Sequence, residues 1–169
     1  MTRAAAILLG FLLAGAAAAA VARPATVEQL AREADAVVQG RVVAMESRWA
    51  PDRRHVVTRV IVRVSRVLRG TAGAEVALEV AGGTVGGFGQ RVDAAPSFEM
   101  GEEAVIFLRR AGGRTLVHGA AQGKFRVVGG EARPGLEGWT FAAEALPAGE
   151  RRAEPMSLTE LARRVEGAR

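Results

Sequence analysis

The sequence contains no cysteine, no tyrosine and a single lysine, Lys124, among its 169 residues. Without cysteine the chain can form no disulfide, carry no lipid on an N-terminal cysteine and build no cysteine-containing zinc site. Only two histidines occur, His55 and His118, and they lie far apart in the sequence. Two separated histidines cannot supply the three or four ligands that zinc requires, so we expect no metal site.

Motifs for nucleotide binding and for nucleophilic catalysis are also missing. The glycine-rich run at 82–89 is not followed by Gly-Lys-Ser/Thr, lacks the Gly-x-Gly-x-x-Gly spacing and does not lead into a helical pattern. No serine lies in a Gly-x-Ser-x-Gly context, and there is no cysteine nucleophile. The sequence therefore predicts a protein that is not an enzyme, with no catalytic residues and no cofactor.

The first 22 residues have the pattern of a secretory signal peptide. A short basic start containing Arg3 precedes the apolar run 4–13, and small residues then lead to Ala20-Val21-Ala22, which fits the A-x-A cleavage pattern. An uncleaved anchor is the alternative, because apolar and small residues continue to Ala22. We expect cleavage, and hence a secreted or periplasmic protein that has no membrane span afterwards.

The middle of the chain has the period of β-structure. Residues 56–64 alternate, with apolar residues and Thr58 at even positions and Arg59 and Arg63 on the other face. Residues 75–80 alternate again, and their two glutamates could pair with those arginines across the strands, an interpretation that we favour over an anion site. Further strands are expected at 36–45, with a bulge at the internal Gly40, and at 104–108, 115–118 and 119–128.

Capping boxes predict one helix at each end of this β-region. Thr26 to Gln29 begins a short helix, and Ser157 to Glu160 begins a terminal one. Residues 139–141 could add a short strand. Strands with internal glycines suit a small coiled barrel, which also removes free sheet edges. We therefore expect a mainly β fold, a five-stranded OB-like barrel at 23–130 followed by a C-terminal arm at 131–169; the alternative is a β-sandwich.

The long glycine-rich segment at 82–103 is the expected binding site. Long connections in small β-domains often carry function, and glycines let the backbone approach a partner closely. The candidate binding residues are the apolar Val85, Phe88 and Phe98 and the guanidinium of Arg91. The alternative is structural: Phe88 and Phe98 would plug the barrel mouth, and the glycines would only permit tight turns.

Four motifs stand out along the chain: Ala-Asp-Ala-Val-Val-x-Gly-Arg-Val at 34–42, Gly-Gly-x-Val-Gly-Gly at 82–87, Pro-x-Phe-x-x-Gly-Glu at 96–102 and Ala-Gln-Gly-Lys-Phe at 121–125. In these motifs the chain resembles a group of uncharacterised secreted bacterial proteins. The resemblance covers roughly residues 26–128 and implies a netrin-like, tissue-inhibitor-of-metalloproteinase type of OB fold. Those inhibitors chelate the protease zinc through an N-terminal cysteine, which this chain lacks, so inhibition does not carry over.

Together these observations predict a secreted or periplasmic binding module that recognises a protein or envelope component as a monomer. Nucleic acid is not an expected partner, because the candidate aromatics do not form a stripe on one strand and the address is extracytoplasmic. One alternative is a metalloprotease-inhibitor-like or protease-associated module. Another is a weak hydrolase that uses His118 with a carboxylate.

Overall fold

The computed structural model describes residues 24–136 and 153–168. This part of the chain is mainly β, with one short helix before the strands and one helix after them. The signal peptide and the possible strand at 139–141 lie outside the described residues. The helices are α1 (Val27–Glu33) and α2 (Leu158–Gly167), and η1 (Ala120–Gly123) is a single 3-10 turn. The strands are β1 (Ala36–Trp49), β2 (Val56–Gly70), β3 (Glu75–Ala81), β4 (Gly83–Val85), β5 (Phe88–Gln90), β6 (Glu103–Ala111), β7 (Arg114–Val117), β8 (Lys124–Val128), β9 (Glu131–Pro134) and β10 (Met156–Ser157).

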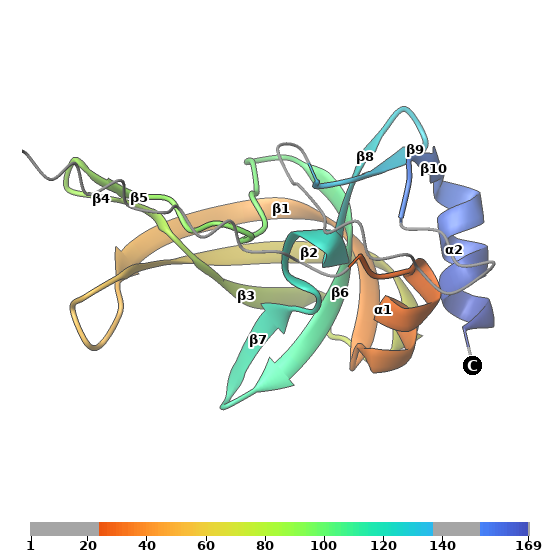
Figure 1. Ribbon diagram of the computed structural model, residues 1–169, viewed down its shortest axis with the longest axis horizontal. Helices are drawn as coiled ribbons and strands as arrows, with labels where there is room; N and C mark the ends of the chain where they lie inside the picture. The colour runs from red at the N-terminus through yellow and green to blue at the C-terminus, as the bar shows by residue number, and fades with distance from the viewer. Residues whose placement is uncertain (1–23, 137–152, 169) are drawn as a thin grey trace, which may run out of the picture.

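One antiparallel sheet, ordered β10-β9-β8-β6-β1-β2-β3, forms the body of the molecule (Figure 1). Strand β7 also pairs with β6, and β4 and β5 form a separate small sheet. Strands β3 and β7 are in contact, and the Arg114 guanidinium of β7 donates a hydrogen bond to the Glu79 carboxylate of β3 at 2.9 Å. No ladder joins β3 to β7 in the described chain, so the sheet curls but the expected closed five-stranded barrel is not confirmed.

The two faces of the sheet bury two separate hydrophobic clusters. On one face, α1 and α2 cover a cluster that includes Val37, Phe107 and Phe125. On the other face, the curled strands bury a second cluster around Val60 and Ile106. The alternation predicted for β2 is confirmed from Thr58 to Arg63, where the even positions are buried and the two arginines are exposed; Val57 is buried as well, and Val64 is half-buried. This second cluster is the interior against which the candidate site is built.

Local sequence signals explain the bulge in β1 and the cross-strand charges. The register between β1 and β2 shifts between Gln39 and Gly40, as the internal glycine predicted. A Cβ at Gly40 would lie 2.4 Å from the carbonyl oxygen of Arg63, so the strands can approach there only at glycine. Arg63 faces Glu75 in the β2–β3 register and forms an ion pair with it at 3.2 Å, which confirms the cross-strand interpretation for this pair.

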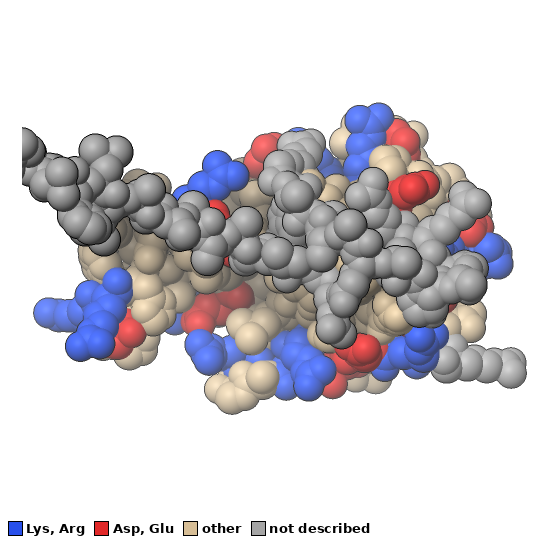
Figure 2. Space-filling model, viewed as in Figure 1, with Lys and Arg blue, Asp and Glu red and all other residues tan. Residues whose placement is uncertain are grey.

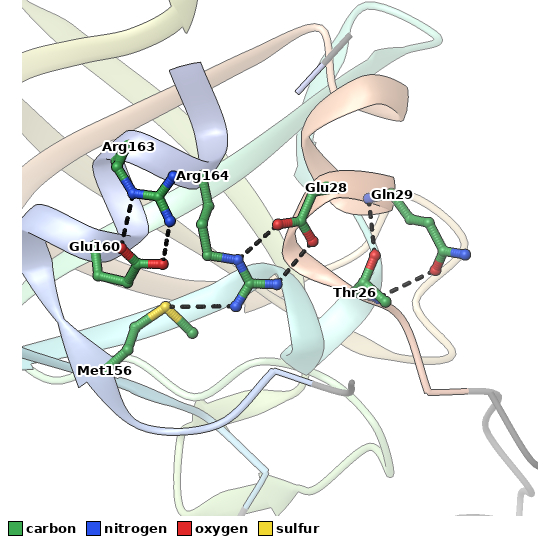
Figure 3. Close-up of polar contacts among 7 residues, drawn as sticks. All are labelled: Thr26, Glu28, Gln29, Met156, Glu160, Arg163 and Arg164. Carbon is green, nitrogen blue, oxygen red and sulfur yellow. Dashed lines mark hydrogen bonds and ion pairs between the residues drawn. The ribbon is translucent and has the colours of Figure 1, made fainter. Parts of the chain in front are cut away.

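The two helices are tied to each other by a charged pair (Figure 3). The Arg164 guanidinium donates to both carboxylate oxygens of Glu28, at 2.6 and 2.7 Å, and holds the pKa of that carboxyl below its usual range. The Thr26 capping box is complete. At α2 only half of the predicted box forms: Ser157 accepts from the Glu160 amide, while the Glu160 side chain pairs with Arg163.

Candidate functional site

The segment at 82–103 has two parts, a short hairpin and an extended strap. The hairpin pairs β4 with β5, and Gly86 and Gly87 form its two-residue turn, with φ of 55° and 83°. Two positive φ angles in a two-residue turn match the right-handed twist of a hairpin, and glycine adopts them without strain. The strap, residues 91–102, then runs without regular structure to β6. Part of the segment that was expected to be a loop is therefore regular β-structure.

Hydrogen bonds fix the base of the hairpin to β1 and β2. The Thr58 hydroxyl donates to the Gly82 carbonyl at 2.7 Å, and the Ser47 hydroxyl lies 2.8 Å from Thr58 Oγ1. The backbone amide of Val56 donates to the side-chain oxygen of Gln90 at 2.6 Å. A Cβ at Gly83 would lie 2.3 Å from the Thr58 hydroxyl oxygen. The hairpin is therefore held at both of its strands and presents its turn in a defined direction.

An aromatic pair lies between this hairpin and the end of β1. Trp49 and Phe88 stack with ring centroids 5.1 Å apart and ring planes inclined by 28°. Their exposed fractions are 39% and 50%, and Phe88 pairs in register with the half-buried Val85. Large exposed aromatics in contact with each other form a surface that water solvates poorly, and such surfaces are typical of binding sites.

Three arginines lie within a few positions of Trp49 or Phe88 in the sequence, and none of them forms an ion pair within the described residues. Arg53 and Arg54 belong to the β1–β2 turn directly after Trp49, and Arg91 follows β5. All three are exposed. The neighbouring carboxylate of Asp52 is engaged by His55, with 3.0 Å between Oδ2 and Nδ1. Figure 2 shows Lys and Arg atoms gathered at the same end of the molecule as the β1–β2 turn.

The strap is clasped to the sheet by a buried charge pair. Lys124 Nζ lies 2.5 Å from Glu102 Oε1, and the two side chains are 6% and 1% exposed. The ammonium also donates to the Ser97 carbonyl and lies 4.6 Å from the centre of the Phe98 ring. Burial lowers the pKa of Lys124, and its hydrogen bond to Glu102 opposes that shift. The second Glu102 oxygen accepts from the Glu99 amide at 2.9 Å.

Between the strap and the sheet lies an open groove of about 1020 Å³. Its floor consists of side chains from the interior of the curled sheet, among them Met45, Thr58 and Val60. Arg91 and Phe98 contribute to its rim from the strap. Lys124 and Glu102 form an ion pair at one side of this groove, and this pair joins the end of the strap to β8.

The four candidate residues fall into separate environments. Val85 and Phe88 lie on the hairpin, and Phe88 is exposed as the binding hypothesis requires. Arg91 is exposed at the start of the strap. Phe98 is half-buried, packs against the interior cluster and lies beneath Lys124. This position agrees with the alternative in which Phe98 has a structural role. The structure thus joins only part of the predicted set into one surface.

Trp49 belongs to this surface although the sequence did not place it there. It ends β1, some forty positions before Phe88, and the fold brings the two rings together. The only sequence signal is the pair Gly86-Gly87 between Val85 and Phe88, which is a hairpin signature. This signature predicts the hairpin but not the ring against which it packs.

The two histidines pair with carboxylates at separate places. His118 Nε2 lies 3.2 Å from Glu33 Oε2, and His55 pairs with Asp52. Across residues 24–136 and 153–168, neither histidine has a hydrogen bond to a serine or threonine hydroxyl. The same residues contain no group of three histidine, aspartate or glutamate side chains placed to hold a metal ion.

Neither helix of the described chain is long and apolar enough to cross a membrane. No protein-family model matches the chain, and no curated protein matches it in sequence.

Proposed function

We propose that this protein is a secreted or periplasmic binding module, without enzymatic activity, that recognises a protein or envelope partner through the 82–103 segment. The observation that carries the proposal is the exposed Trp49–Phe88 stack on a hairpin that is hydrogen-bonded to the sheet. A rigid aromatic anchor contributes a large contact area and loses little conformational entropy on binding, because its rotamers are already restricted.

The proposal includes the OB-like architecture and the resemblance to secreted netrin-like proteins. Strand β1 pairs with both β2 and β6, and the edge strand β3 is in contact with β7, which pairs with β6. These features support a half-closed barrel of the OB type. The module would act as a monomer after cleavage of the leader at residue 22.

Point substitutions test this function better than removal of the hairpin. Deleting 82–89 would also remove Gly82 and Gly83, which pack against Thr58 and Ser47 inside the fold. The double substitution Trp49→Ala/Phe88→Ala changes only exposed side chains. We expect it to abolish retention of material from an envelope fraction by the immobilised protein, while its circular dichroism spectrum stays unchanged.

The matched control is Val67→Ala. This side chain is also an exposed apolar group, at 39%, and it lies on β2 outside the lining of the groove and outside the 82–103 segment. The control should retain the same envelope material as the parent chain. If the parent and the Trp49→Ala/Phe88→Ala chain retain equal amounts, the 82–103 segment is not the recognition surface.

A further inference from the structure

The aromatic pair and the unpaired arginines lie on a projecting end of the molecule. In Figure 1 the β1–β2 turn and the β4–β5 hairpin both extend at the left end, opposite the helices. We propose that this end docks on an anionic lipid surface, with Trp49 and Phe88 entering the interfacial layer and the arginines binding headgroup phosphates. This inference rests on the proposed function and names the chemistry of its ligand.

The shape of this end favours a lipid surface over a peptide. A peptide ligand is normally held in a groove or added to a sheet edge, whereas the Trp49–Phe88 stack projects beside the groove. A bilayer interface needs no matching cavity, because headgroups move aside for a projecting side chain. Tryptophan is enriched at this interface because its ring is apolar while its N–H can remain hydrogen-bonded.

The charges at this end are arranged for phosphate binding. Arg53, Arg54 and Arg91 have no ion-pair partner in the part of the chain that the structure describes, so their guanidinium forks are available. The carboxylates next to them in the sequence are Asp52 and the exposed Asp93, so three arginines stand against two carboxylates at this end. The formal charge of the whole chain is +5, and it falls to +4 when cleavage after residue 22 removes Arg3, so the mature chain still adds a favourable field. Guanidinium binds phosphate oxygens in a bidentate manner.

Neither contribution is sufficient alone. Trp49 and Phe88 already cover part of each other's surface, so their insertion contributes only a modest free energy of binding. Each arginine near an anionic surface adds about 1 kcal/mol. Peripheral binding of this kind therefore requires both signals, as it does for lipid-anchored proteins. Binding should consequently depend on anionic lipid, weaken with salt, and be lost when either the aromatic or the basic group is removed.

The experiment uses phosphatidylcholine vesicles with and without phosphatidylglycerol, some of them carrying bromine-labelled acyl chains. The full chain with Trp139→Phe leaves Trp49 as the single fluorophore. We expect a blue shift and bromine quenching of Trp49 with phosphatidylglycerol vesicles alone, and reversal by added salt. A chain attached only through its apolar residues 4–22 would sediment with vesicles of both kinds without quenching of Trp49.

Two charge-reversal variants separate local from general electrostatics. Arg53→Glu/Arg54→Glu should weaken vesicle binding at least about tenfold. Arg32→Glu/Arg109→Glu makes the same change in net charge at exposed arginines on α1 and β6, and should weaken binding much less. Equal weakening by both variants, quenching on neutral vesicles, or no quenching would overturn the inference. If quenching is absent while Trp49→Ala/Phe88→Ala still abolishes retention of envelope material, the lipid inference fails and the binding function stands; if retention also persists, both fail.

Discussion

The Lys124–Glu102 clasp gives the sharpest stability prediction. The change is Lys124→Met, which keeps most of the side-chain length and removes the ammonium. Glu102, 1% exposed, would keep its hydrogen bond from the Glu99 amide and a single guanidinium nitrogen of Arg126 at 4.0 Å. Leaving one charge of a buried pair without its partner costs about 3–5 kcal/mol. Because the half-exposed Arg126 could move closer, we expect the lower end, about 3 kcal/mol.

The assay is urea unfolding at pH 7, followed by far-ultraviolet circular dichroism. The double variant Lys124→Met/Glu102→Gln keeps an acceptor for the Glu99 amide and leaves no buried charge. It should therefore be more stable than Lys124→Met alone. A loss below about 0.5 kcal/mol for Lys124→Met, or a double variant less stable than the single one, would refute the account of the clasp.

The stability of the protein at alkaline pH should report on the titration of Lys124. The sequence has no tyrosine, no cysteine and no second lysine, so Lys124 and the terminal amine are the groups that titrate between the neutral range and the arginines. Burial lowers the folded pKa of Lys124 below its ordinary 10.5. Between those two values the unfolded chain binds more protons than the folded chain, so the free energy of unfolding should rise with pH there. Lys124→Met should lack that rise, and an equal rise in both chains would refute the assignment.

Three further changes test other parts of the fold. Glu28→Gln should lower the free energy of unfolding by about 1 kcal/mol at neutral pH, a modest loss because the carboxylate is partly exposed. Arg164 lowers the pKa of Glu28, so the whole loss should be present above pH 4.5 and should disappear as acid protonates the folded carboxyl. Urea unfolding at several pH values would measure it. Val60→Asp should prevent folding, seen as loss of dispersed amide resonances, because the side chain is 1% exposed inside the sheet. Gly40→Ala should cost about 1–3 kcal/mol in thermal or urea unfolding, whereas Gly167→Ala, with open space around its Cβ, should cost far less.

The strands of the sheet could be predicted from the sequence because their signal is local. Alternation in β2 and β3 indicates which face is buried, although Val57 and Ile61 interrupt it in β2, and the internal glycine of β1 marks a bulge. The segment at 119–128 was predicted as one kinked strand, but it contains the 3-10 turn η1 before β8. Glycines mark a bend in either structure, so composition alone does not distinguish them.

The candidate site could be predicted only in part because it depends on long-range contacts. Strands β4 and β5 have three residues each, which is too short for alternation to be recognised. Phe88 was predicted as a binding residue, but its partner Trp49 comes from the end of another strand. The clasp likewise joins Lys124 to Glu102. Both residues lie in sequence motifs, at 121–125 and 96–102, but nothing in either motif indicates that the two side chains meet. Such pairs follow from the register of the sheet.

Site-specific photocross-linking in the producing cell tests the recognition surface most directly. A photoreactive phenylalanine derivative would be placed at position 88 in one chain and at position 67 in a control chain, both exposed positions. The account predicts adducts with a lipid or protein component of the envelope from position 88 and none from position 67. Equal adducts from both positions, or none from position 88 in a folded and exported chain, would contradict it.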